Sequence, residues 1–268
     1  MSENNLIKVE LDGHIARFIL NRPEKLNAIG MDGFEQLVEI FTETDKNPEI
    51  RVIVLKGEGK CFTSGIDLAA LSSLSNDGAA DSREFLRKTI LNGQESMNII
   101  ERCTKPVIAA VHGYCLGAGV DLLSACDIRI ASQDAVFSVR EVKMGIIADL
   151  GTLQRLPHII GHGWFRELAL TGRDFSAKEA LQMGFITRIS DSKETLFQEA
   201  EKLAQEIASC APLTVQGTKD VLLYSRDNGV EAGLKYVAQK NAAALPCEDI
   251  MEAITAVMEK RTPVFKGK

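Results

Sequence analysis

The first half of the chain alternates short apolar runs with stretches of helical periodicity. Four runs rich in isoleucine and valine are bounded by glycine, proline or charged residues, as buried strands usually are. These runs are residues 15–20, 50–55, 107–111 and 128–131. The apolar positions at helical spacing between the first two runs are Met31, Phe34, Val38 and Phe41. Strands that alternate with helices predict an α/β fold with a buried, largely parallel sheet.

The second half of the chain differs, because strand signals fade from about Ser176 onward. One apolar stripe at helical offsets comprises Leu196, Ala200, Leu203 and Ile207. A second stripe near the end comprises Ile250, Ile254 and Val257. Such wide stripes predict amphipathic helices that pack on the core, on each other or on another subunit. Between the two halves no repeat is visible, and residues 76–82, which are small and polar, are the candidate for a mobile loop.

Composition and charge exclude several function classes. The chain has 268 residues, of which 45% are hydrophobic and 25% charged, as in a globular protein with a sizeable core. A net charge of −6 without a lysine or arginine run argues against nucleic acid or an anionic membrane as the main partner. No apolar stretch reaches the roughly 18 residues that a membrane span needs. The polar start and the absence of a Ser-Lys-Leu end lead us to expect a cytoplasmic protein.

Cysteine and histidine usage gives no indication of a metal site. The six cysteines are scattered without a Cys-x-x-Cys pair, and the four histidines do not cluster at ligand spacing. Cys126 and Cys210 lie in apolar stretches. We therefore expect buried, reduced thiols and no bound metal.

Two glycine-rich segments each lead from an apolar strand into a helix, at residues 57–68 and 111–123. Such a junction leaves free backbone N–H groups at the positive end of the helix dipole. These groups can bind phosphate or stabilise a developing oxyanion. The dinucleotide-binding fingerprint fails, because Leu122 stands where its third glycine belongs. A hydride-transferring oxidoreductase is therefore disfavoured.

A third segment, residues 139–157, places two carboxylic acids among apolar residues. Glu141 and Asp149 are surrounded in the sequence by valine, methionine, isoleucine, alanine and leucine. If both side chains line an apolar pocket, loss of hydration and mutual repulsion raise at least one pKa toward neutrality. Acid–base catalysis near neutral pH requires such a shift.

Together these segments resemble the crotonase superfamily, also called the enoyl-CoA hydratase/isomerase superfamily, over residues 7–265. Each motif alone is weak, whereas the ordered set is specific. The motifs are Asn21-Arg-Pro-Glu-Lys-Leu-Asn-Ala28, Phe62-Thr-Ser-Gly-Ile-Asp-Leu68, Pro106-Val-Ile-Ala-Ala-Val-His-Gly113, Gly117-Ala-Gly119, Ala125-Cys-Asp-Ile-Arg129 and Glu259-Lys-Arg-Thr-Pro-Val-Phe265.

The resemblance implies a crotonase-like spiral of ββα units with a helical C-terminal region. We expect residues 1–190 to form the core with the coenzyme A (CoA) site and the active site. Residues 191–268 are expected to form a helical trimerisation region. The assembly implied is a homotrimer or a dimer of trimers, which is a homohexamer.

The resemblance also implies an acyl-CoA thioester substrate whose carbonyl accepts hydrogen bonds from the backbone N–H groups of Ile66 and Ala118. These donors stabilise an enolate. Typical hydratases of the family carry glutamates at the positions of Asp121 and Glu141 and a glycine at that of Asp149. The third acid, in Ala148-Asp-Leu-Gly-Thr-Leu-Gln-Arg-Leu-Pro157, resembles the family's dienoyl-CoA isomerases.

Such an isomerase moves two conjugated double bonds by one position each, from 3,5-dienoyl-CoA to 2,4-dienoyl-CoA in fatty acid degradation. The reaction removes a proton from C2 and returns one at C6. By analogy we assign Glu141 to C2 and Asp149 to C6, while Asp121 tunes their pKa values or orients a water. The three acids are expected to titrate as a coupled set. The short side chain of Asp121 predicts weak hydration.

Further residues are carried over as CoA contacts. Lys25, Ala28, Asp67 and Leu68 are expected beside the nucleotide, and Lys260 and Arg261 would approach its phosphates from a neighbouring subunit. No cofactor is expected, because coenzyme A is part of the substrate. Three other readings remain open at this point: a 2-enoyl-CoA hydratase, a Δ3-Δ2 isomerase, and a non-catalytic scaffold subunit that binds acyl-CoA.

Overall fold

The computed structural model describes residues 6–72 and 79–268 of the chain. Its larger β-sheet has the strand order β1-β2-β3-β4-β6-β9. The strands are β1 (Ile7–Asp12), β2 (Ile15–Leu20), β3 (Val52–Gly57), β4 (Val107–Val111), β6 (Ile128–Ser132) and β9 (Ile189–Ser190). Only the β1–β2 pair is antiparallel among these neighbours. A smaller sheet joins β5 (Tyr114–Leu116), β7 (Val136–Ser138) and β8 (Phe175–Ser176).

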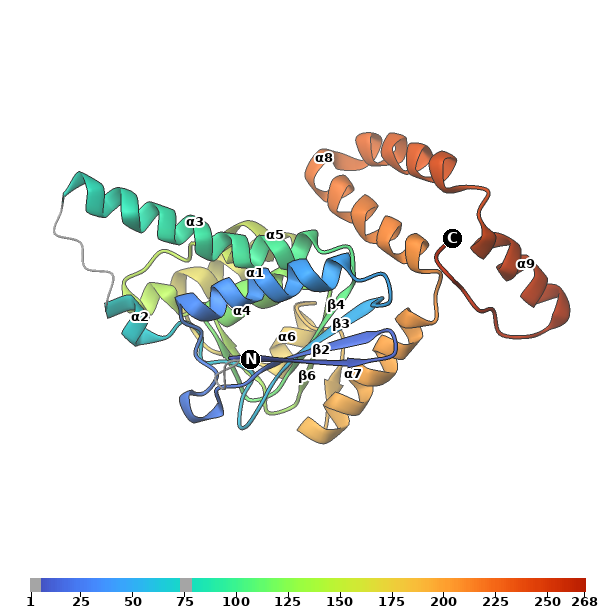
Figure 1. Cartoon of the computed structure of the whole chain (residues 1–268). Helices are drawn as coiled ribbons and strands as arrows, with labels where there is room; N and C mark the ends of the chain where they lie inside the picture. Colours follow the sequence, from blue (N-terminus) through green and yellow to red (C-terminus); the bar gives the residue numbers. More distant parts are fainter. Residues whose placement is uncertain (1–5, 73–78) are drawn as a thin grey trace.

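Both faces of strands β2, β3, β4 and β6 are largely buried, which explains their continuous apolar sequences, whereas the edge strand β1 is mostly exposed. Ile53 and Leu55 of β3 belong to the core cluster that also includes helices α1, α3 and α4. Val52 and Val54, which point to the opposite face, pack against helix α7. The helices over the first face are α1 (Met31–Lys46), α3 (Ala80–Arg102), α4 (Ala118–Ala125) and α5 (Thr152–Thr171), and α7 is Lys193–Ala208 (Figure 1).

Short elements connect these layers. They are η1 (Pro23–Lys25), α2 (Leu68–Ser72), η2 (Glu141–Met144) and α6 (Ala177–Gln182). The mobile-loop prediction for residues 76–82 falls partly outside the described residues, since 73–78 are not described. Its last residues begin α3, so that part of the prediction is wrong.

The predicted α/β fold class with a helical C-terminal region is confirmed, with local corrections. The predicted strands at 15–20 and 107–111 have the observed bounds, whereas β3 begins at Val52. Strand β9 was not predicted, because two residues carry no periodicity. In α1 the buried stripe runs through Leu37 and Ile40 and leaves Val38 only partly covered. All six cysteines are free, but Cys210 is exposed, so the expectation of a buried thiol is wrong there.

The C-terminal region consists of α8 (Pro212–Ala244) and α9 (Glu248–Glu259), which extend away from the sheet (Figure 1). Helix α8 is kinked at Gly229, whose φ of 82° is left-handed. Its two halves fold back on each other at this kink. The rings of Tyr224 and Tyr236, one from each half, stack with their centroids 4.1 Å apart. The division at residue 190 stays a prediction, although α7 packs on the core sheet.

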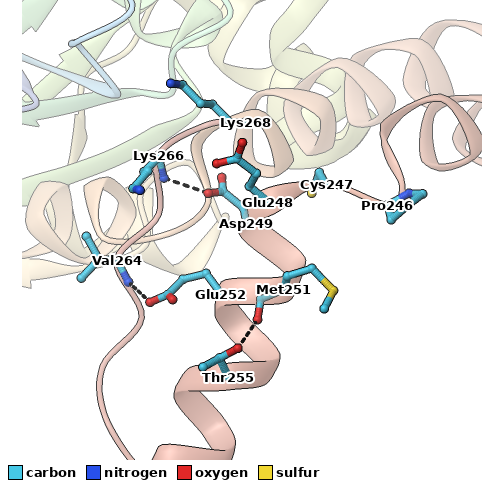
Figure 2. Close-up of a pocket in the computed structure, with 10 residues that line it drawn as sticks. All are labelled: Pro246, Cys247, Glu248, Asp249, Met251, Glu252, Thr255, Val264, Lys266 and Lys268. Atoms are coloured by element: carbon cyan, nitrogen blue, oxygen red, sulfur yellow. Dashed lines mark hydrogen bonds between the residues drawn. The ribbon is translucent and has the colours of Figure 1, made fainter.

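The last residues of the chain form hydrogen bonds with the start of α9 and with the core. At the start of α9 the Asp249 carboxylate accepts a hydrogen bond from the N–H of Lys266 (2.8 Å; Figure 2). It also accepts one from the N–H of Gly267 (2.9 Å). Arg51, beside β3, donates to the carbonyls of Ala208 (3.0 Å) and Phe265 (2.8 Å). One arginine thus joins the end of α7 to the C-terminal tail. Of the described helices, none has the length and apolarity to cross a membrane.

Candidate active site

The two glycine-rich junctions run side by side at one end of the parallel strands. The N–H of Phe62 donates to the carbonyl of His112 (2.8 Å), and that of Thr63 donates to the carbonyl of Tyr114 (2.9 Å). The Leu116 N–H donates back to the Thr63 carbonyl (3.2 Å). This pairing brings the start of α4 next to the loop that precedes α2.

Gly65 makes the close approach of these two backbones possible. Its φ is +96°, and a Cβ there would lie 2.5 Å from the Leu116 carbonyl oxygen and 3.6 Å from the Ala118 nitrogen. Within the described part of the chain, no carbonyl accepts a hydrogen bond from the N–H of Ile66 or of Ala118. Two neighbouring backbone donors are therefore available to an oxygen atom of a ligand.

Asp121 lies on α4 and is 1% exposed. Its Oδ1 accepts a hydrogen bond from the Thr152 N–H (2.6 Å), the first residue of α5. A helix N-terminus stabilises a carboxylate, but burial outweighs this effect and raises the pKa of Asp121 to about 6. The carboxyl group of Asp121 therefore takes up a proton at a pH only slightly below neutrality.

Glu141 begins η2, and its carboxyl group lies beside Gly117. A Cβ at Gly117, which has a φ of +52°, would lie 3.2 Å from Glu141 Oε1. Burial raises the pKa of Glu141 to about 7, and repulsion by Asp121 adds to that rise. Among the described residues Glu141 Oε2 is buried and has no hydrogen-bond partner. An uncommitted carboxyl with a pKa near neutrality suits proton transfer.

Asp149 occupies the loop between η2 and α5 and is partly buried. Burial raises the pKa of its carboxyl, and its charge in turn raises those of Asp121 and Glu141. Its backbone carbonyl accepts from Gln94 Nε2 of α3 (2.8 Å). The structure therefore brings the three predicted acids into one electrostatically coupled group next to the two free N–H donors.

Four of the predicted CoA contacts also lie together. The Ser64 N–H donates to the Leu26 carbonyl and the Asp67 N–H to the Ile29 carbonyl, both at 2.9 Å. These bonds place the segment with Lys25 and Ala28 against that with Asp67 and Leu68. Lys25 and Leu68 are exposed, whereas Ala28 is partly buried. The carboxylate of Asp67 lies 3.0 Å from Arg22 Nη1, a partner that the motif alone did not reveal.

The remaining two, Lys260 and Arg261, are not brought to this site within one chain. They follow α9, at the opposite end of the molecule from α2 (Figure 1). Arg261 pairs with Glu252 (2.6 Å) and Glu259 (2.7 Å). Contact with CoA would require a second subunit, so their role stays a prediction.

Sequence reasoning missed the polar residues behind Asp149. Arg155 of α5 and Arg226 of α8 both pair with Glu101 of α3. One sequence signal is an arginine six residues after Asp149, in the first turn of α5. Across residues 6–72 and 79–268 no group of three or more histidines, cysteines or acids is arranged to hold a metal ion.

Comparison with known proteins identifies the family of the chain. Residues 10–268 match the family model described as enoyl-CoA hydratase/isomerase. The chain is 47% identical over 265 residues to the peroxisomal Delta(3,5)-Delta(2,4)-dienoyl-CoA isomerase of Arabidopsis thaliana, covering 97% of this chain and 95% of that protein. It is 44% identical over 269 residues to the mitochondrial enzyme of that name from Mus musculus, covering 97% and 82%.

Solved structures agree as well. The enoyl-CoA hydratase from Bacillus anthracis superposes with a TM-score of 0.92 at 32% sequence identity, covering 98% of this chain and all of that one (100%). The resemblance inferred from the sequence motifs is therefore confirmed. Because the family model spans nearly the whole chain and the relatives exceed 40% identity, this protein belongs to the enoyl-CoA hydratase/isomerase family of enzymes.

Proposed function

We propose that this enzyme isomerises 3,5-dienoyl-CoA thioesters to 2,4-dienoyl-CoA thioesters. The observation that carries the proposal is the third carboxyl, Asp149, in electrostatic contact with Asp121 and Glu141. A hydratase adds water and a proton to the two adjacent carbons of one double bond, whereas a dienoyl isomerase transfers protons at two well-separated carbons, C2 and C6. The names of the Arabidopsis and mouse relatives support the same reaction.

The proposed reaction consists of two proton transfers through a dienolate. Glu141, ionised, takes a proton from C2, and the electron pair moves onto the thioester oxygen. The N–H groups of Ile66 and Ala118 stabilise that oxygen, and losing one such donor typically costs roughly 3–4 kcal/mol of barrier. Asp149, protonated, then delivers a proton to C6, which leaves double bonds at C2 and C4. The steps balance without an oxidant, a metal or a cofactor beyond the CoA of the substrate.

Asp121 is proposed to tune the other two acids. Its Oδ1 is engaged by the Thr152 N–H at 2.6 Å, so that oxygen is not free to orient a water molecule. This contact supports slow hydration. The alternative function, a 2-enoyl-CoA hydratase, is favoured by the name of the Bacillus anthracis structure. A scaffold subunit that only binds acyl-CoA is the third possibility tested below.

Binding of the CoA moiety is proposed at Lys25, Ala28, Asp67 and Leu68, with Lys260 and Arg261 contributed by another subunit of a homotrimer or homohexamer. Fatty acid β-oxidation is the proposed setting. A cytoplasmic location remains our prediction, although the two relatives are named peroxisomal and mitochondrial. Cell fractionation with an antibody against the chain would decide it.

The test is a spectrophotometric assay of purified protein with a medium-chain 3,5-dienoyl-CoA, run beside hydration of a 2-enoyl-CoA. We expect a fast rise of the conjugated 2,4-dienoyl absorbance that collapses in Asp149→Asn. The matched control is Asp32→Asn, an exposed acid in the first turn of α1, which should keep the wild-type rate.

The other outcomes have separate meanings. Strong hydration without a dienoyl signal would replace the isomerase with the hydratase. Tight acyl-CoA binding with neither reaction would support the scaffold reading. Dialysis against a chelator should leave the dienoyl rate unchanged, since the proposed steps use no metal.

A further inference from the structure

A polar cavity of about 460 Å³ adjoins Asp149 on the side that faces α3 and α8. It is walled by the loop after η2 and by three helices. Its lining includes Asn98 and Glu101 of α3, Arg155 of α5, and Arg226 of α8. None of these is part of the proposed proton transfers, so their position next to Asp149 requires another explanation.

Arg155 lies at the centre of this group, and its side chain is only 10% exposed. Its Nη2 donates to Asn98 Oδ1 at 2.6 Å, and its Nε lies 3.2 Å from Glu101 Oε1. A buried guanidinium needs a counter-charge, which Glu101 supplies. Arg226 of α8 pairs with the same Glu101 oxygen. One carboxylate therefore connects α5 with the first half of α8.

Arg155 also lies directly against the loop that carries Asp149. A Cβ at Gly151, where φ is +128°, would lie 1.9 Å from Arg155 Nη1, so only glycine leaves room for the guanidinium. Arg155 Nη1 donates to the Leu150 carbonyl at 3.5 Å, and the backbone N–H of Arg155 donates to the Gly151 carbonyl at 2.9 Å. With Gln94 bound to the Asp149 carbonyl, the loop is held from both α3 and α5.

The charge of Arg155 acts on the acids as well. Its positive charge opposes the burial that raises the pKa of Asp121. Other charged or titratable groups face this region from every element packed against it. They are Asp121 on α4, Glu141 on η2, Asp149 in the loop, Glu101 on α3, His158 on α5, and Arg226 and Asp227 on α8.

We propose that Arg155 is a positioning residue that fixes the loop carrying Asp149 and supplies the positive charge for the carboxyl group cluster. The Glu101 carboxylate partly neutralises the positive charge of Arg155. Arg226 of α8 fixes the position of Glu101 through a second ion pair. The kinetic part of this inference rests on the proposed isomerase function, whereas the electrostatic part does not.

The test compares Arg155→Gln with Glu101→Gln, which remove opposite ends of one buried ion pair. Carboxyl titrations are followed by carbon-13 NMR of the free protein labelled at aspartate and glutamate, with Asp121→Asn and Asp149→Asn used for assignment. Loss of the cation should move the Asp121 and Asp149 titrations to higher pH, and loss of the anion should move them to lower pH. A purely structural pair predicts similar falls in Tm without opposed movements, and that result would overturn the proposal.

Kinetics give the second readout. In Arg155→Gln we expect kcat for 3,5-dienoyl-CoA to fall roughly ten- to a hundredfold with little change in KM, because the loop is misplaced while the CoA contacts remain. Arg155→Lys keeps the positive charge, so the carboxyl titrations should return toward their wild-type pH. It should recover only part of kcat, because lysine lacks the planar guanidinium. Arg102→Gln, an exposed α3 arginine paired with Glu95, is the matched control and should change neither readout. If wild-type protein has no dienoyl activity, the proposed function fails, and the NMR comparison still decides the role of Arg155.

Discussion

Glu141 shows how a reactive residue can reduce the stability of the fold that holds it. Its folded pKa of about 7 lies above the ordinary 4.5 of a glutamate. At a pH below 4.5 the Glu141 carboxyl is protonated in both the folded and the unfolded chain, so its burial as a charge does not lower the free energy of unfolding. As pH rises toward about 7 the unfolded chain ionises first, so the free energy of unfolding falls across this window.

Replacing Glu141 with glutamine should remove this penalty. We expect Glu141→Gln to raise the free energy of unfolding at about pH 8 by on the order of 1–3 kcal/mol and to leave it unchanged near pH 4. Urea titrations at the two pH values measure this. Glu35→Gln, an exposed acid of α1, is the control. An equal gain at both pH values would mean that the effect is not electrostatic.

The same group should set the pH dependence of the reaction. Because Glu141 must be ionised to take the C2 proton, we expect kcat/KM to fall as pH decreases through about 7. The apparent pKa belongs to the coupled acids rather than to one residue. Stopped-flow rates between roughly pH 5 and 9 measure it. A flat profile down to the ordinary carboxyl range would contradict the assignment of Glu141 as the base.

Individual acids could be predicted from the sequence, whereas their supporting contacts could not. The position of Glu141 and Asp149 among apolar residues made them candidates, and the resemblance to the family's motifs gave them roles. Arg155, Glu101 and Arg226 meet only through tertiary packing of α3, α5 and α8. No local pattern encodes such a contact. Similarly, the exposure of Cys210 depends on where α7 ends and not on the apolar residues before it.

At the scale of elements, the strand-to-helix junctions are the most constrained part of the fold. Their glycine pattern predicted free N–H groups, and the pairing of the two segments explains why Gly65 has no room for a side chain. What the pattern could not predict is that the two junctions touch, since that depends on β3 and β4 being neighbours in the sheet.

A methyl group at Gly65 should therefore damage catalysis more than folding. We expect Gly65→Ala to lower kcat by roughly a hundredfold or more, the loss typical of one oxyanion donor, because Cβ would displace the Leu116 carbonyl. Gly13→Ala is the matched control, since Gly13 has a φ of +55° but open space around it. It should show backbone strain in its Tm and a normal kcat. Equal kcat losses in both variants would refute the explanation.

Helix α8 is attached to the core by a second buried ion pair, which lies at some distance from the carboxyl cluster. Lys219 Nζ lies 2.7 Å from Asp127 Oδ2, and Lys219 is 6% exposed. Burial raises the pKa of Asp127 despite this partner. Such a pair mainly specifies where α8 lies, because the buried Lys219 ammonium loses its hydration while Asp127 stays partly exposed.

Removing only one partner should be costly. We expect Lys219→Met to lower the free energy of unfolding by roughly 1.5–3 kcal/mol, because Asp127 loses its counter-charge and keeps only the hydrogen bond from the Val107 N–H. The double variant Lys219→Met/Asp127→Asn should recover most of this loss. Denaturant titration gives the energies, and hydrogen exchange reports whether α8 has detached. A double variant as unstable as the single one would place the cost in packing rather than in charge.

At the scale of the whole molecule, a single chain leaves apolar surface on its C-terminal helices. Val257 and Met258 of α9 are 78% and 79% exposed, although the sequence periodicity predicted a buried face there. Periodicity identifies an apolar face but not whether its partner lies in the same chain. For α7 the partner is the sheet, whereas for α9 we predict another subunit.

Charging this face should break the assembly. We expect wild-type protein to have the mass of a homotrimer or homohexamer, and Val257→Glu/Met258→Glu to shift it toward monomer. Analytical ultracentrifugation measures the mass, and the KM for acyl-CoA should rise if Lys260 and Arg261 act across subunits. Leu11→Glu on β1, also an exposed apolar position, is the control. A monomeric wild-type protein would contradict the prediction.

The two carbonyls bound by Arg51 lie at the two ends of the C-terminal helical region, α8 and α9. Ala208 precedes α8 and Phe265 follows α9, so the intervening chain forms a ring closed at one guanidinium. A ring fixed at both ends has far fewer conformations than a tail fixed at one, and the entropy of closing it depends only weakly on its length. Lys219 and Arg226 also hold the first half of α8 on the core. The second half of α8 and α9 are therefore the free part of this ring, and a partner that binds either of them also restricts the other.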